Sequence, residues 1–141
     1  MAMQAVDIFT PTVVANGPIT VFRCVDFNGN QAATPGMKVH GVARQAADEA
    51  GDAIPIVCLG TAIVETGGVF AAGDSLVTDN QGRAVKNTGA LAIAAGATAV
   101  TSAAANGAND LTGSDLPEWV FGDALAASTG AGNFVEVLLR R

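Results

Sequence analysis

Residues 60–84 constrain the fold more than any other stretch, because short apolar runs alternate there with forced reversals. Gly67-Gly68 interrupts one run, Gly73-Asp74 opens the next, and Asn80-Gln81-Gly82 ends it. Reversals of this kind at this spacing are typical of antiparallel strands joined by tight turns. The sequence therefore predicts a mainly β fold, a small β-barrel or β-sandwich with little helix. Its structural turn residues are expected to be Gly67, Gly68, Gly73, Asp74 and Gly82.

The apolar composition also favours strands over helices. Val occurs 16 times, against 8 Leu and 6 Ile, and β-branched residues suit a pleated sheet. The 17 Gly point the same way, since each costs about 1 kcal/mol in a helix interior. We expect one helical turn, at residues 45–50, and the clearest strands at residues 19–27, 36–43, 54–64 and 133–140.

The chain length of 141 residues indicates one domain, preceded by an arm. Residues 1–18 are predicted to be an extended N-terminal arm, because Pro11 and Pro18 remove backbone donors that a central strand would need. Residues 19–141 are expected to form a single β-rich domain. A small-residue insertion, rich in Ala, interrupts that domain at about residues 86–118.

The arm carries more apolar surface than a solvated tail would. Its extended backbone is expected to have unpaired N–H and C=O groups, which can add a strand to the sheet of another protein. The alternative is that the arm packs on its own domain as an edge strand. The candidate docking residues are Val6, Ile8, Phe9, Val13 and Val14.

The charge balance argues against two classes of partner. The net charge is −6 with only 7 basic residues, whereas nucleic-acid binding needs several cationic phosphate contacts. Residues 87–109 carry no charge, but their large apolar residues are too few for a membrane span. The N-terminus also lacks the basic and apolar regions of a signal peptide. We therefore expect neither a nucleic acid nor a membrane as partner.

Catalytic and metal-binding patterns are missing from the sequence. His40 is the sole histidine and has no nucleophile motif beside it. Cys24 and Cys58 are far apart, without the paired spacing of a zinc site, and are expected to be buried thiols. We predict that the protein is not an enzyme and uses no metal and no cofactor.

Several motifs, taken in order, resemble the capsid cement, or head decoration, proteins of tailed bacteriophages. They cover most of residues 36–85 and 119–141, while residues 86–118 depart from the pattern. The matching segments are Gly41-Val42-Ala43, Gly60, Ala72-Gly73-Asp74-Ser75-Leu76, Asp79 to Ala84, Phe121 to Ala126, and Asn133 to Leu139.

The resemblance implies a structural protein of the virion that binds the outer surface of the mature capsid and stabilises it. It implies the major capsid protein as partner, synthesis in the cytoplasm of the host bacterium, and self-association, with a homotrimer expected and a dimer as second choice. The alternative is a β-barrel module that binds a small ligand or a carbohydrate. The scarcity of aromatic residues, six Phe and one Trp without Tyr, weighs against that alternative.

Overall fold

The computed structural model describes residues 4–88 and 118–140, and in these residues it contains strands and turns but no helix. All strand pairings are antiparallel, so the prediction of a mainly β fold is confirmed. Most of the predicted insertion at residues 86–118 lies outside the described residues. The twelve strands are β1 (Asp7–Phe9), β2 (Thr12–Val14), β3 (Cys24–Val25), β4 (Gly41–Ala43), β5 (Ala53–Val57), β6 (Leu59–Glu65), β7 (Val69–Phe70), β8 (Ser75–Thr78), β9 (Ala84–Lys86), β10 (Gly122–Ala124), β11 (Ser128–Thr129) and β12 (Phe134–Leu139).

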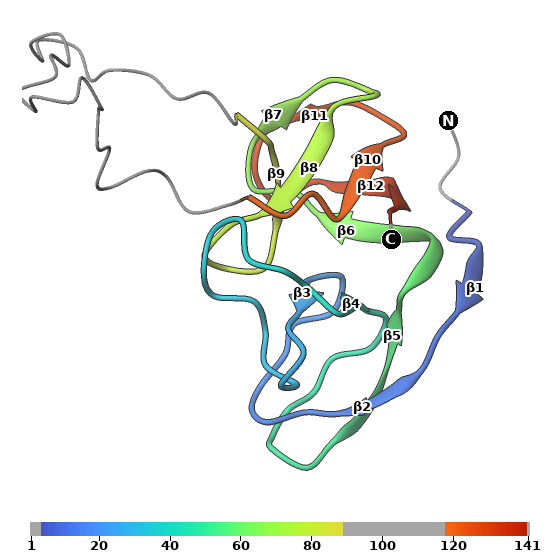
Figure 1. Cartoon of the computed structure of the whole chain (residues 1–141), viewed down its shortest axis with the longest axis vertical. Helices are drawn as coiled ribbons and strands as arrows, with labels where there is room; N and C mark the ends of the chain where they lie inside the picture. Colours follow the sequence, from blue (N-terminus) through green and yellow to red (C-terminus); the bar gives the residue numbers. More distant parts are fainter. Residues whose placement is uncertain (1–3, 89–117, 141) are drawn as a thin grey trace, which may run out of the picture.

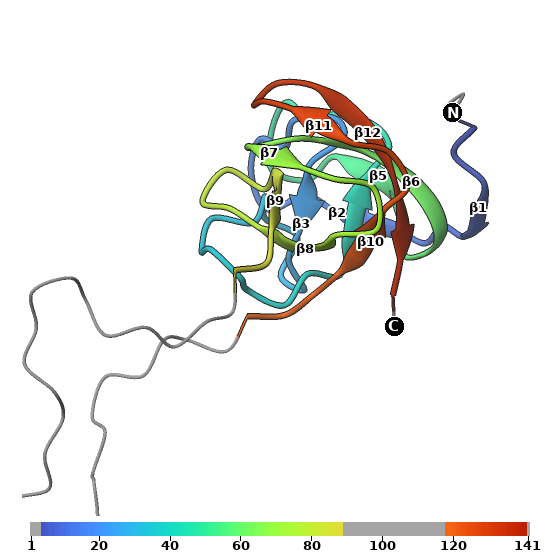
Figure 2. The same ribbon diagram turned by 90° about the horizontal axis from the view of Figure 1, so that it is seen from above.

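The strands form three sheets, none of them closed. The largest has the order β1-β6-β12-β10-β8-β9, and a four-stranded sheet has the order β2-β5-β4-β3. The third pairs β7 with β11. A single bridge between Thr66 and Ala84 links the end of β6 to β9. The large sheet therefore curls back toward its own first strands, as Figure 2 shows from above.

Two apolar clusters lie on opposite faces of the four-stranded sheet. Cys24 and Val42 belong to the larger cluster, which fills the space under the large sheet. Their chain neighbours Val25 and Ala43 belong to the smaller cluster. Side chains alternate between the faces of a strand, so an apolar pair of neighbours requires that both faces are covered. The larger cluster extends from this sheet to β8 and β12 of the large sheet, whereas the smaller cluster stays with β2 to β5, which Figure 1 shows in the half of the molecule away from β8 and β12.

Four predicted elements differ from the structure. The strand expected at residues 36–43 is shortened to β4, and the strand expected at residues 54–64 is divided into β5 and β6, which belong to different sheets. The strand expected at residues 19–27 is reduced to β3, because Phe22 has a positive φ of 64° and turns the chain. The helical turn expected at residues 45–50 does not form. Ala47 instead exchanges hydrogen bonds with Ile19 at 2.9 Å in both directions, which ties its backbone into a β-bridge.

The N-terminal arm is extended, but its backbone is paired with its own domain. β1 pairs with β6 and β2 pairs with β5, so the two arm strands are the edges of the two larger sheets. Figure 1 shows them in blue along the outside of β5 and β6. The expectation that the backbone of the arm is unpaired is therefore wrong. β5 and β6 supply the backbone partners of the arm, which no local sequence pattern could reveal.

Candidate functional site

The outer edge formed by β1 and β2 is the first candidate interaction site. The Phe9 carbonyl accepts a hydrogen bond from the Cys58 N–H at 2.9 Å, and the Pro11 carbonyl accepts one from the Ile56 N–H at 3.0 Å. Alternate residues of an antiparallel strand direct their backbone groups to opposite sides. Thr10 and Thr12 therefore direct theirs away from the domain, as an added strand would require.

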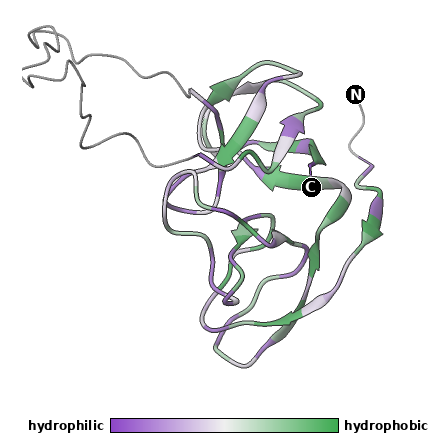
Figure 3. Ribbon diagram, in the orientation of Figure 1, coloured by the Kyte–Doolittle hydropathy of each residue, from purple (hydrophilic) through white to green (hydrophobic). Residues whose placement is uncertain are grey.

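Apolar side chains accompany this edge. Ile8 is 75% exposed, Val14 64%, Val6 55% and Phe9 54%. Figure 3 shows hydrophobic segments of β1 and β2, next to hydrophilic ones, on the outside of the molecule. Val13 differs from the other four candidates, since it packs against the smaller apolar cluster. An exposed edge with apolar side chains is a ready template for pairing with another chain.

A buried carboxylate holds the beginning of the arm. Glu136, on β12, is 5% exposed and accepts hydrogen bonds from the backbone N–H groups of Gln4 and Ala5 at 3.1 and 3.2 Å. The Thr61 hydroxyl donates a third at 2.6 Å. These donors, Thr61 first, hold the pKa of Glu136 below its ordinary value, although burial acts in the opposite direction. An ion pair between Asp7 and Arg44 adds a further attachment.

Gly60 makes the close approach of the arm possible. Its φ is +104°, and a Cβ at this position would lie 2.2 Å from the carbonyl oxygen of Val6. Only glycine combines this backbone conformation with so short a separation from another backbone. Gly60, the second residue of β6, is thus the residue against which β1 packs.

The predicted turn residues lie between successive strands. Gly67 and Gly68 separate β6 from β7, and Gly73 with Asp74 separates β7 from β8. Asp74 accepts a hydrogen bond from the Ala71 N–H at 2.9 Å and pairs with Lys86 at 3.0 Å. The Ala71 bond, followed by Lys86, lowers the pKa of Asp74. Gly82, with φ +75°, lies in the turn before β9.

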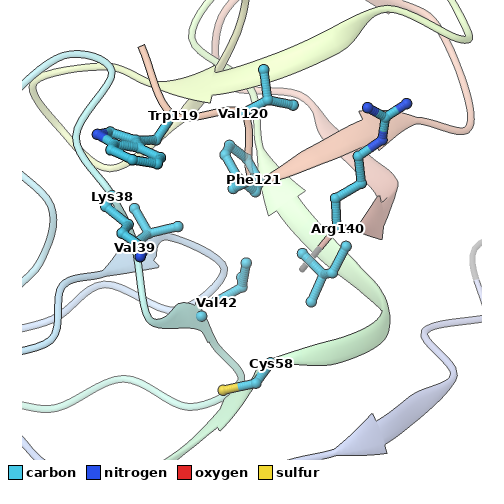
Figure 4. Close-up of a pocket in the computed structure, with 10 residues that line it drawn as sticks. Lys38, Val39, Val42, Cys58, Trp119, Val120, Phe121 and Arg140 are labelled. Atoms are coloured by element: carbon cyan, nitrogen blue, oxygen red, sulfur yellow. The ribbon is translucent and has the colours of Figure 1, made fainter. Parts of the chain in front are cut away.

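A pocket between the two sheets is a second candidate site, and sequence analysis missed it. Its volume is about 470 Å³. Figure 4 shows Lys38 and Trp119 on one side, Arg140 on the other and Phe121 between them. These residues are far apart in the sequence, so only the position of the sole Trp beside a strand could have hinted at the site. The remaining lining residues are Val39, Gly41, Val42, Cys58, Val120 and Leu139.

The other titratable candidates have structural environments. Cys24 and Cys58 are both buried thiols that are not joined in a disulfide, and burial raises the pKa of Cys24 to about 12, so its thiol stays protonated. His40 stacks on Phe27 with ring centroids 4.8 Å apart. Across residues 4–88 and 118–140, no group of three or more His, Cys, Asp or Glu side chains is placed to hold a metal ion. The same residues contain no helix with the length and hydrophobicity needed to cross a membrane.

Comparison with known proteins gives a match in structure only. No family model matches the sequence, and no curated protein matches it. Among solved structures, the chain is similar to the N base of the head fibre gp8.5 of bacteriophage phi29. The similarity has a TM-score of 0.62 at 18% sequence identity, and it covers 94% of this chain and 93% of the other. At this identity the match establishes a shared fold.

Proposed function

We propose that this protein is a structural component of a phage virion that binds the outer surface of the mature capsid and stabilises it, as cement and decoration proteins do. The observation that carries the proposal is the fold shared with a phage head fibre base over nearly the whole of both chains. The order of motifs that resembles head decoration proteins supports the same conclusion independently. In this proposal the protein is not an enzyme, and it is made in the cytoplasm of the host bacterium.

The exposed edge of β1 and β2 is the proposed contact with the major capsid protein. Four apolar side chains and outward backbone groups lie together there, a combination that favours addition of a partner strand. A protein that binds assembled capsid subunits and not free ones stabilises the assembled capsid by mass action. Self-association into a homotrimer, or into a dimer as second choice, would raise attachment further through avidity.

Co-sedimentation with capsids tests this function. The protein is mixed with mature capsids of the phage whose genome encodes it, and bound protein is measured after gradient sedimentation. We expect saturable binding by the native chain and a loss of at least tenfold in affinity for Ile8→Lys. Failure of the native chain to sediment with capsids would overturn the proposal.

A matched control locates the contact. Val69, on β7, is 71% exposed, so Val69→Lys introduces the same charge at an equally exposed apolar position away from the arm. We expect Val69→Lys to bind as the native chain does. If Val69→Lys loses binding and Ile8→Lys keeps it, the contact lies in the turns of residues 67–82 instead of the edge.

A capsid reconstruction tests the self-association. Isolated copies of the protein on the capsid surface would contradict the trimer.

A further inference from the structure

The walls of the Trp119 pocket are apolar over most of their extent. Val42, Cys58 and Phe121 line it and are all at least nine-tenths buried. The volume of about 470 Å³ falls in the range of pockets that hold small organic ligands, roughly 300–1,000 Å³. The pocket can therefore take an apolar group of several carbon atoms.

The charged residues that line the pocket are both cations. Lys38 and Arg140 lie at its rim, and none of the lining residues is acidic, although the chain has 13 acidic and only 7 basic residues. Arg140 pairs with Asp123 through its Nε atom. The pocket lining therefore carries charge of positive sign only, and Asp123 neutralises the part that Arg140 contributes.

Lys38 differs from the other cations of the described residues. In residues 4–88 and 118–140 the ion pairs involve the other Lys and Arg residues and not Lys38. Its ammonium lies instead 5.2 Å from the ring centroid of Trp119 and 5.9 Å from that of Phe27. Cation–π contacts position the charge without neutralising it. A carboxylate that reached the rim would find this cation already in place.

From this arrangement we infer that the pocket is a binding site for an amphipathic organic anion. The apolar part of the ligand enters between Val42 and Phe121, and its carboxylate pairs with Lys38 at the rim beside Trp119. A cationic ligand is disfavoured by the two rim cations. A carbohydrate is disfavoured because the floor offers few polar groups to satisfy its hydroxyls.

The site is separate from the proposed capsid contact. None of residues 4–14 lines the pocket, and Ile8 and Val14 lie on the outer edge of the molecule. Ligand binding and capsid attachment can therefore fail or succeed independently. The inference goes beyond the role in the virion and does not depend on it.

The sole tryptophan provides a direct readout. The chain has one Trp and no Tyr, so its intrinsic fluorescence on excitation at about 295 nm comes from Trp119. The Trp119 side chain lies on the rim and is 50% exposed. The full chain is titrated with octanoate and, separately, with octanol, which has the same chain length and no charge. We expect a saturable change in emission with octanoate and at least tenfold weaker binding of octanol, a difference of about 1.4 kcal/mol. Equal affinities would overturn the inference, and so would the absence of saturable octanoate binding.

Two variants test the role of Lys38. We expect Lys38→Gln to reduce the preference for octanoate over octanol at least fivefold, as measured by calorimetric titration, which does not depend on the environment of Trp119. Lys86→Gln removes the same charge from a residue outside the pocket and should keep the native preference. Thermal unfolding checks that both variants fold. If Lys38→Gln is folded and keeps the native preference, the assignment of the anion to Lys38 is wrong.

Discussion

The strands at the two ends of the chain have similar apolar sequences and opposite environments. β12 lies between β6 and β10, and its Val135 and Val137 are buried in the larger cluster. β1 and β2 lie at sheet edges, where Ile8 and Val14 are mostly exposed. The place of a strand in its sheet, more than its hydrophobicity, therefore decides whether it stabilises the fold or remains available to a partner. The following predictions test this contrast, from the largest expected effect to the smallest.

Truncation of one apolar side chain in each region should give very different losses of stability. Val137→Ala removes two methyl groups from a fully buried site and should lower the free energy of unfolding by about 2–3 kcal/mol. Ile8→Ala should change it by less than about 0.5 kcal/mol, because the side chain already contacts water. Denaturant unfolding with unchanged slopes measures both. Comparable losses would mean that the edge belongs to the folding core.

A side chain at position 60 should weaken the attachment of β1 for two reasons: the positive φ of Gly60 and its close approach to Val6. Gly60→Ala places a methyl group against the Val6 carbonyl, whereas Gly73→Ala has a similar φ, +88°, and no neighbour within 4 Å. We expect the free energy of unfolding to fall by about 2 kcal/mol in Gly60→Ala and by about 1 kcal/mol in Gly73→Ala.

Amide hydrogen exchange shows which backbone hydrogen bonds are weakened in each of the two glycine variants. In Gly60→Ala the Cys58 and Thr61 N–H groups, which donate to Phe9 and Val6, should lose protection. In Gly73→Ala they should keep it. Equal protection in the two variants would show that the arm does not need the close approach at Gly60.

Removal of the Glu136 charge should loosen the beginning of the arm while β12 stays in place. Glu136→Gln retains one acceptor oxygen and should lower the free energy of unfolding by about 1 kcal/mol. Proteolysis at sites before residue 9 should become faster. Glu49→Gln provides a control at an exposed carboxylate. Cleavage within β12 as the first event would contradict this assignment.

The same carboxylate predicts a dependence on acid. The folded pKa of Glu136 is lowered, so the stability it contributes is fully present above its ordinary pKa of 4.5. That contribution is lost as the pH falls from there through the folded value. The difference in unfolding free energy between the native chain and Glu136→Gln should therefore shrink below pH 4.5. A difference in unfolding free energy that stays constant until Glu136 is fully protonated would show that the contacts of Glu136 with the arm do not depend on its charge.

The sequence predicted the general fold well because the relevant signals are local. Glycine and aspartate at residues 73–74 and glycine at 82 set the turns through their own backbone preferences. The run at residues 133–140 predicts β12, whereas the single strand predicted at residues 54–64 is divided in the structure into β5 and β6. The strand predicted around Phe22 failed because the contacts of the folded chain impose a positive φ there. Hydrophobicity and an extended backbone do not distinguish Val13, which packs against the smaller cluster, from the other four docking candidates.

The amino-acid sequence by itself determined that the chain forms short antiparallel strands with glycine turns and an acidic surface. It did so because propensities, turn chemistry and charge are properties of neighbouring residues. Only the tertiary structure decided that the arm is an edge of its own sheets, that Glu136 reaches Gln4, and that Lys38, Trp119 and Arg140 surround one pocket. These features join residues about 20 to more than 130 positions apart, and strand order and register fix such distances only when the whole fold is assembled.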